Sequence, residues 1–441
     1  MVRMINQYRM FFFVQHTHRM TDVVQKKYRN HYRKILTLFL IPIFVSGSTS
    51  GADWPQWGGP GRNFQVSGVK LADSWPDEGL GPIWKRTLGN GYSSIVADNN
   101  RLFTMFRKNG RETVCALEAD TGKTIWRYDY LAPFLEGTDV KEFGPGPLST
   151  PLIAGKRLYA VGVTGILHCL DLDSGQSLWS HQLVRDLQGT NLYRGYSASP
   201  IAYQDGVILP VGGPGRAVVA FHKQDGKILW QQHDFAISHV SPILVRLEDQ
   251  NQLVVVGEKV IVGLDPGTGE SCWQLAHPIL GGHIASTPII GPDGRLFYSG
   301  AYGAGSRCIQ LTQTNKRTIA TESWKNTRLR IHHSNGIRVG DFIYGSSGDF
   351  AAILWMALNV RTGKVVWRDR KVGRASCLHV DGKFILLQED GTLMLAKMSN
   401  EGLQIQSTTK LFNQRAWTTP TLIGHRLYAR NRQEIVAIEL P

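Results

Sequence analysis

Short runs of alternating apolar and polar residues extend along most of the chain, and turn residues separate them. Residues 147–183 contain four such runs, PLSTPLIA, RLYAVGV, ILHCLDL and QSLWSHQL. Gly155-Lys156 lies between the first two runs, and Asp173-Ser174-Gly175 lies between the last two. Alternation with a period of two predicts β-strands, and the glycine-containing pairs predict tight turns. We therefore expect four antiparallel strands joined by short connections.

This four-strand pattern repeats at a spacing of roughly 40 to 50 residues, a period typical of β-propeller blades. The phrase ALEADTGKTIW (116–126) returns as CLDLDSGQSLW (169–179), AFHKQDGKILW (220–230), GLDPGTGESCW (263–273) and ALNVRTGKVVW (357–367). The glycine of each phrase predicts the hairpin between the third and fourth strands. The tryptophans predict packing between neighbouring blades, and they are Trp84, Trp126, Trp179, Trp230, Trp273, Trp324 and Trp367.

The number of repeats predicts an all-β fold, an eight-bladed β-propeller of four-stranded antiparallel blades. Seven complete sets of strands run from Tyr92 to about Lys410, and an eighth set has only three strands before Pro441. We expect the missing strand at residues 82–88, so that an N-terminal strand closes the ring and leaves few free sheet edges. Seven blades with one stray strand is the alternative.

The start of the chain has the composition of a targeting segment. A basic stretch ending at Arg33-Lys34 precedes the apolar run ILTLFLIPIFV (35–45), and small residues follow this run. This order is typical of a signal peptide, and the apolar run is too short to span a bilayer. We expect a leader at residues 1–52, an N-terminal extension at 53–81 and the propeller at 82–441. The expected product is exported, periplasmic or extracellular, and soluble after cleavage, with no transmembrane segment.

Charge and cysteine content restrict the function classes. The formal net charge is +14, and the leader carries about half of it. Since no run of Lys or Arg follows the leader, nucleic acid is not an expected partner. The chain has 5 cysteines, with no C-x-x-C and no vicinal pair, so a cysteine-based metal site is not expected. They are interpreted as small buried apolar residues.

The phrase A-x-D-x-x-T-G-K-x-x-W resembles the repeat of propellers of the pyrroloquinoline quinone (PQQ) type. This superfamily includes the quinoprotein alcohol dehydrogenases and the non-catalytic propeller lipoprotein of the outer-membrane assembly machinery. The stretch DWPQWGGPGRN (53–63) resembles the opening of exported bacterial PQQ-like repeat proteins. The resemblance covers about residues 54–440 and implies an eight-bladed fold.

The chain departs from both relatives in residues that matter for their function. The dehydrogenases use a vicinal Cys–Cys ring, a Ca²⁺ site of Glu and Asn or Asp, and an Asp base. This chain has no Cys–Cys pair and no cysteine near the expected cleavage site, so a lipid anchor is not expected. The resemblance therefore implies the scaffold more than the redox chemistry. We predict no cofactor, and PQQ with calcium is the alternative that lacks motif support.

A shared site in a propeller lies where the innermost strands begin, around one mouth of the channel. When the first strands of the eight repeats are aligned, one position holds a small polar residue in every repeat, which predicts packing and hydrogen bonding near the axis. These residues are Ser94, Thr150, Ser199, Ser241, Thr287, Asn335, Ser376 and Thr419. Two positions earlier the residue types differ between repeats, as expected of a binding site. The candidate ligand-binding residues at and near this mouth are Tyr92, Arg194, Tyr196, His239, His283, His332, His333, Arg374 and Trp417.

These residue types suit an anionic or planar ligand, because guanidinium and imidazole groups bind anions and aromatic faces stack on flat groups. The histidines show neither H-x-H nor H-x-x-x-H spacing, so no metal site is predicted. No G-x-S-x-G element or paired carboxylates are recognisable, and no catalytic residue is assigned.

The sequence thus predicts an exported, non-catalytic binding or interaction scaffold, monomeric, with a protein, small-molecule or glycan ligand at the channel mouth. Two alternatives stay open. One is a small PQQ-dependent dehydrogenase of alcohols or sugars. The other is a carbohydrate- or polymer-binding module that uses Trp417 and the tyrosines.

Overall fold

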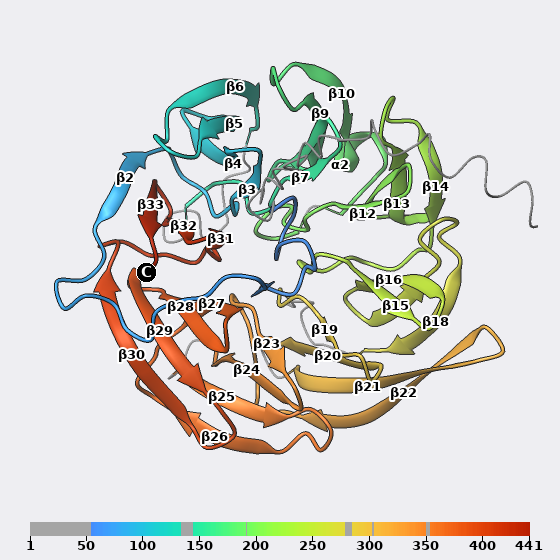
Figure 1. Ribbon diagram of the computed structural model, residues 1–441. Coiled ribbons are helices and arrows are strands. Elements are labelled where there is room, and N and C mark those ends of the chain that lie inside the picture. The colour runs from blue at the N-terminus through green and yellow to red at the C-terminus, as the bar shows by residue number, and fades with distance from the viewer. Residues whose placement is uncertain (1–53, 134–143, 191, 278–284, 302–303, 350–352) are drawn as a thin grey trace, which may run out of the picture. The chain divides into compact units, whose positions relative to one another are not determined.

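Eight antiparallel sheets follow one another around a ring in the computed structural model (Figure 1). The structure describes residues 54–133, 144–190, 192–277, 285–301, 304–349 and 353–441, all within one compact unit, Ser50–Pro441. Each sheet has four antiparallel strands, and one sheet carries a fifth strand, which is parallel. This confirms the prediction of an eight-bladed β-propeller.

The blades use the chain in order, with the first strand innermost and the fourth at the rim. Blade 1 consists of β3 (Val96–Asp98), β4 (Arg101–Lys108), β5 (Arg111–Glu118) and β6 (Thr124–Leu131), and blade 2 of β7 (Leu152–Ala154), β8 (Arg157–Val161), β9 (Ile166–Asp171) and β10 (Ser177–Gln182). Blade 3 consists of β11 (Ile201–Tyr203), β12 (Gly206–Gly213), β13 (Arg216–His222) and β14 (Ile228–Gln232). Blade 4 consists of β15 (Ile243–Leu247), β16 (Gln250–Val256), β17 (Val260–Leu264) and β18 (Ser271–Ala276). A short helix, α2 (Leu183–Asp186), follows β10.

The second half of the ring contains the longest hairpin and the closing blade. Blade 5 consists of β19 (Ile289–Ile290), β20 (Arg295–Gly300), β21 (Gly305–Thr314) and β22 (Arg317–Asn326), and blade 6 of β23 (Ile337–Val339), β24 (Phe342–Ser347), β25 (Leu354–Asn359) and β26 (Val365–Asp369). Blade 7 consists of β27 (Ala375–Val380), β28 (Lys383–Gln388), β29 (Thr392–Met398) and β30 (Leu403–Lys410). Blade 8 consists of β31 (Thr421–Ile423), β32 (Arg426–Arg430) and β33 (Glu434–Glu439), and β2 (Pro82–Thr87) completes it. The fifth strand of blade 7 is β1 (Gln65–Val66).

The ring is closed by strands from both ends of the propeller sequence. β2 pairs antiparallel with β33, with Lys85 opposite Val436, so an N-terminal strand supplies the rim of blade 8. This confirms the expected closure, and the seven-bladed alternative is wrong because the C-terminal strands form a full blade. Pairing of distant segments makes the sheets one cooperative unit, since no blade can leave without breaking a neighbour's contacts.

The repeated phrase forms the joints between blades. In the outer strands the tryptophan Nε1 donates a hydrogen bond to a backbone carbonyl oxygen near the hairpin turn of the next blade. The pairs are Trp84–Ala119 (2.8 Å), Trp126–Leu172 (3.1 Å), Trp179–Lys223 (3.2 Å), Trp230–Pro266 (3.2 Å), Trp324–Val360 (2.7 Å) and Trp367–Ser399 (2.8 Å). Each indole therefore contributes buried apolar area and one satisfied polar contact to the joint.

Trp273 departs from this arrangement for a structural reason. The next blade has the long hairpin β21–β22, so its turn does not lie where the other blades place theirs. Trp273 Nε1 instead donates to Gln252 Oε1 in its own blade at 2.8 Å, and Gln252 Nε2 donates to Thr318 Oγ1 at 2.6 Å in blade 5. Gln252 thus relays the contact that a turn carbonyl provides elsewhere.

Substituting the turn glycine that meets a tryptophan is expected to lower stability more than substituting an equally left-handed glycine in open space. Gly122 has φ +69°, and a Cβ there would lie 2.6 Å from Trp84 Cε3. Gly110, in the same blade, has φ +75° with no atom within 4 Å. We expect Gly122→Ala to cost about 2–4 kcal/mol, from left-handed strain plus overpacking, and Gly110→Ala about 1 kcal/mol.

Urea unfolding of the two variants and the unaltered chain measures this difference. Because both glycines share the same backbone strain, the excess loss in Gly122→Ala reports the packing of the indole alone. Equal losses of stability in the two variants would show that Trp84 does not pack against the turn at Gly122.

Candidate functional site

The two faces of the propeller differ, and strand direction defines them. The inner strands begin at the face that we call the open face, which also carries the connections between second and third strands. Residues 54–66, which we call the plug, lie at the opposite end of the channel. Trp54 pairs with Ala97 at the end of β3, and β1 pairs parallel with His379 and Val380 at the end of β27. In Figure 1 this blue segment crosses the middle of the ring.

The plug is anchored to blades on several sides of the axis. Ile153 N donates to Pro55 O at 2.7 Å, and Trp57 Nε1 donates to Thr287 Oγ1 at 2.9 Å. The Arg62 guanidinium donates to Ser199 O at 3.2 Å and to Pro200 O at 2.9 Å. Blades 2, 3 and 5 are thereby joined through one short segment, which occupies this end of the channel.

Residues 67–81, which we call the strap, then run outward over blade 7 to β2. Lys383 Nζ donates to Leu71 O at 3.0 Å, and Trp75 N donates to Ser407 Oγ at 2.8 Å. Ala72 N donates to Pro441 O, the last residue of the chain, at 2.8 Å. The segment predicted only as an N-terminal extension therefore fills one end of the channel and continues along blade 7 to its outer strand.

The column of small polar residues forms a buried belt in the channel. Ser94 N donates to Thr150 Oγ1 at 3.1 Å, Thr150 N to Ser199 Oγ at 2.9 Å, and Ser199 N to Ser241 Oγ at 2.8 Å. Each hydroxyl thus accepts from the backbone of the preceding blade, near the axis where the blades converge. The belt is structural, because these polar atoms are satisfied within the protein.

Aromatic side chains from three blades meet at the open face. The rings of Tyr92 and Trp417 have centroids 5.4 Å apart, and His333 stacks on Trp417 at 5.3 Å with an interplanar angle of 6°. Arg415 lies over the same indole at 4.8 Å from its centroid. His333 has φ +52°, a backbone conformation that costs energy for a side chain of this size and often marks functional positions.

The indole that a glycan-binding module would use is therefore already contacted by an imidazole and a guanidinium. A sugar stacking on Trp417 would have to displace the imidazole or the guanidinium. This makes carbohydrate binding through Trp417 less favourable than the scaffold or dehydrogenase function. His332 lies beneath the cluster, buried, with its ring centroid 3.8 Å from that of His333.

Ion pairs extend this cluster toward blade 7. Glu389 accepts from Arg374 and from Arg415, each at 3.0 Å, and Arg374 also donates to Asp349 O at 2.6 Å. Asp349 pairs with Arg330 at 2.9 Å. Arg374, Glu389 and Arg415 line an open groove of about 820 Å³, which Asp390, Lys410 and Gln414 also line.

The other candidate residues that the structure describes make contacts elsewhere or lie in the core. His239 Nδ1 lies 2.8 Å from Ser197 Oγ, across blades 3 and 4. Tyr196 is 1% exposed and its hydroxyl donates to Pro210 O at 2.7 Å, so its ring packs within the core. Arg194 is half-buried in the connection that precedes β11. His283 lies outside the described residues.

Glu389, Asp349 and Arg415 were not among the residues predicted from the sequence. They lie on connections that were not part of the aligned column, although Arg415 is two residues before Trp417 and so on the same side of an extended segment. Among the described residues, no three His, Cys, Asp or Glu side chains gather closely enough to bind a metal ion. The cysteines are all free thiols, and Cys272 is the one that is half-buried.

Two buried histidines outside this cluster make stability depend on pH. His168 is 5% exposed between Tyr128 and Tyr130, and burial lowers its pKa to about 4. His277 is 1% exposed against Tyr298, and burial together with the charge of Arg307 lowers its pKa to about 3. The unfolded chain takes up protons near pH 6.5, where the folded chain does not.

Stability is therefore expected to be full above about pH 6.5 and to fall as the pH drops toward 4. At pH 5 the loss from each histidine is up to about 2 kcal/mol. Unfolding in urea at pH 7 and pH 5 measures it, and the double variant His168→Phe, His277→Phe should lose much less stability over this range. The same loss in the double variant would contradict the assignment to these histidines.

Comparison with known proteins agrees with this architecture. A protein-family model described as outer membrane protein assembly factor BamB matches residues 77–233 and 111–369. The chain belongs to this family. The match confirms the resemblance to PQQ-like propellers and the prediction of a propeller interaction scaffold, and it gives the dehydrogenase alternative less support.

Two relatives extend the comparison over most of the propeller. The outer membrane protein assembly factor BamB of Yersinia pestis is 22% identical over 280 residues, which are 62% of this chain and 68% of that protein. The protein of the same name from Shewanella oneidensis is 20% identical over 347 residues, 76% of this chain and 72% of that one. No helix of the described residues is long and apolar enough to span a membrane.

Solved structures share the fold. BamB from Moraxella catarrhalis has a TM-score of 0.59 at 18% identity and covers 82% of this chain and 100% of its own. A quinohemoprotein alcohol dehydrogenase from Pseudomonas putida has a TM-score of 0.64 at 12% identity and covers 88% of this chain and 80% of its own. At these identities the likeness shows the fold alone.

Proposed function

We propose that this protein is an exported scaffold of the cell envelope that binds an acidic segment of another protein through its open face. The observation that carries the proposal is the difference between the two faces. The plug fills one end of the channel, whereas the open face presents side chains that differ from blade to blade. A surface selected for one partner is expected to be irregular, and a packing layer is expected to repeat.

Charge distinguishes the faces in the same way. Each charged residue can be assigned to the face at which its strand end or connection lies. On the open face, Lys and Arg outnumber Asp and Glu by about two to one among the described residues, whereas the two kinds are nearly equal in number on the plug face. Excess positive charge speeds association with acidic partners and suppresses binding of basic ones.

Family membership supports a role in protein assembly. The relatives are named outer membrane protein assembly factors, and a scaffold that binds another protein fits that name. Residues 1–52 serve as the cleaved leader in this proposal, and the folded product acts outside the cytoplasm as a monomer.

Photo-crosslinking from both faces tests the proposal. A photoreactive residue replaces Arg328 or Lys371 on the open face and, as matched controls, Lys316 or Lys364 on the plug face; all four are exposed. Irradiation of the source cells should give a defined adduct with one protein from the open-face positions alone. Adducts of equal yield from both faces, or from the plug face alone, would contradict it.

A further inference from the structure

The end of the channel that the plug fills has the properties of a ligand site. Trp54, Arg62 and Phe64 are 4%, 5% and 2% exposed, so the segment is held as deeply as core residues although only its last two residues, Gln65–Val66, form a strand of a blade. Its contacts are made to pre-existing edges: the inner edge of β27 accepts β1 as an added strand, and His379 N donates to Phe64 O at 3.0 Å. Addition of a strand to a free edge is a common way in which proteins bind extended peptides.

Two side chains of the plug give the contact specificity. The Trp57 indole donates to a belt hydroxyl, that of Thr287, at 2.9 Å. The Arg62 guanidinium reaches two carbonyl oxygens of blade 3, and burial lowers its pKa to about 9. A guanidinium has several donors in a fixed plane and is suited to reading paired carbonyl oxygens.

The docked plug also makes contacts within itself. Gly59 N donates to Gln56 O, Arg62 N to Gly59 O, and Phe64 N to Gly58 O, each at 3.0 Å. Trp57 and Phe64 meet edge-to-face with centroids 5.1 Å apart. A segment with its own turn and aromatic contact loses less conformational entropy on docking, which favours binding as a unit.

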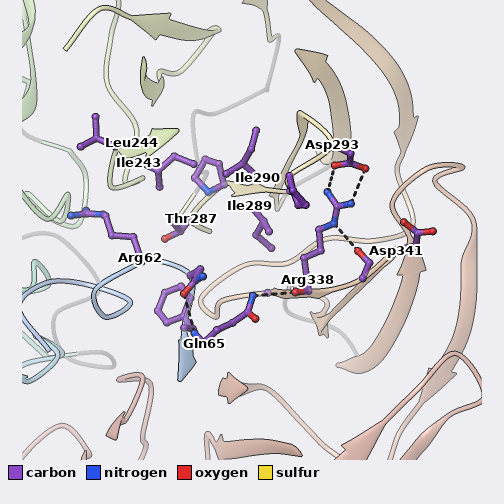
Figure 2. A pocket seen from close by; sticks show the side chains of 18 of the residues that line it. Arg62, Gln65, Ile243, Leu244, Thr287, Ile289, Ile290, Asp293, Arg338 and Asp341 are labelled. Atoms are coloured by element: carbon purple, nitrogen blue, oxygen red, sulfur yellow. Dashed lines mark hydrogen bonds and ion pairs between the residues drawn. The ribbon is translucent and has the colours of Figure 1, made fainter. Parts of the chain in front are cut away.

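The site is larger than its occupant. A cavity of about 500 Å³ lies between residues 61–65 of the plug and blades 4, 5 and 6. Figure 2 shows Ile243, Leu244, Ile289 and Ile290 along one side of it and the Asp293–Arg338 ion pair at the other. Arg338 Nη1 and Nη2 donate to the Asp293 carboxylate at 2.8 and 2.9 Å, so the polar side is fixed. Space of this size admits side chains that the plug itself does not supply.

We propose that this end of the channel is a peptide-binding site, occupied in cis by residues 54–66, that takes a peptide with an aromatic residue and an arginine five positions later. The proposal goes beyond the function assigned to the open face and does not depend on it. A peptide or protein segment with this pattern binds by displacing the plug.

Cutting the chain after folding tests the proposal on the full-length protein. The recognition sequence of a site-specific protease is inserted between Ser67 and Gly68, which are both exposed, and a Cβ at Gly68 would meet nothing within 4 Å. After cleavage, a labelled synthetic peptide DWPQWGGPGRNFQV (53–66) is added, and its exchange with the cut plug is followed by fluorescence anisotropy. Circular dichroism and a thermal melt report whether the propeller stays folded.

We expect the cut protein to stay folded and to bind the labelled peptide saturably. The peptide with Arg62→Ala should bind at least tenfold more weakly. The peptide with Pro60→Ala is the matched control, because Pro60 is exposed in the protein, and it should bind within about twofold of the unaltered peptide. Loss of the fold on cleavage would show that the plug is an integral structural element, and absence of rebinding, or equal affinity of the Arg62→Ala peptide, would equally overturn the proposal.

Discussion

Replacing Arg430 by leucine is expected to lower the free energy of unfolding by about 3–5 kcal/mol. Arg430 lies on β32 and is fully buried, and burial lowers its pKa to about 10, so it is charged at neutral pH. Its guanidinium donates to the carbonyl oxygens of Ser93 at 3.1 Å, Met105 at 2.7 Å and Gly91 at 3.2 Å. Leucine would remove these donors in a site that no water reaches, and Ser93 O would keep the bond from Thr104 Oγ1 at 3.2 Å.

The lost stability should come from the contact between blades 8 and 1, because Arg430 belongs to blade 8 and the three carbonyls belong to blade 1. Urea unfolding followed by tryptophan fluorescence measures it. Arg432→Leu is the matched control: Arg432 is half-buried and its Nε donates to Asn90 Oδ1 at 2.9 Å. We expect it to cost less than about 1 kcal/mol. Similar losses in the two variants would show that Arg430 does not hold the closure.

The fold could be predicted from the sequence because its determinants are local. Alternation within runs of five to eight residues specifies strands, and the glycine of residues 116–126 specifies a hairpin regardless of what surrounds it. The repeat then gives the order of the blades. Trp273 shows the limit of this reasoning, because its partner changes with the length of a hairpin in the next blade.

The plug and strap could not be located from the sequence, because their partners are far away along the chain. Trp57 and Thr287 are 230 positions apart, and no periodicity connects residues 53–81 with the inner strands. The stretch DWPQWGGPGRN carried a family resemblance without indicating where it binds. The folded ring is needed to show that the plug contacts the belt hydroxyl of Thr287 and the edge of β27.

The candidate site was predicted in part, and the reason lies in strand geometry. Aligning the inner strands identified Tyr92, His333 and Trp417, which the structure brings together. Tyr196 is the neighbour of Ser197, and successive residues of an extended segment point to opposite sides, so its ring lies in the core. Glu389 was not predicted because it lies in a connection between second and third strands, and these connections have no sequence pattern that repeats from blade to blade.

The second large effect concerns the open face. Changing Arg328, Arg370 and Lys371 together to glutamate is expected to weaken binding of an acidic polypeptide by about 30- to 100-fold. All three residues are exposed and lie on connections of the open face. Each reversal removes an attraction and adds a repulsion, and exposed pairs contribute up to about 1 kcal/mol each. The effect should shrink at high salt, since exposed charges are screened.

The matched control changes Lys316, Arg317 and Lys364 to glutamate, which are exposed residues on turns of the plug face. The two triple variants have the same net charge, so a difference between them reports the face and not the total charge. Thermal melting before the binding measurement confirms that both are folded.

The most direct test is the dissociation constant of each triple variant and the unaltered chain for a labelled poly-L-glutamate of about twenty residues, measured by fluorescence anisotropy at low salt. We expect the unaltered chain and the plug-face variant to bind alike, and the open-face variant to bind at least 30-fold more weakly. Equal weakening in both variants, or weakening in the plug-face variant alone, would contradict the claim that the open face is the docking surface.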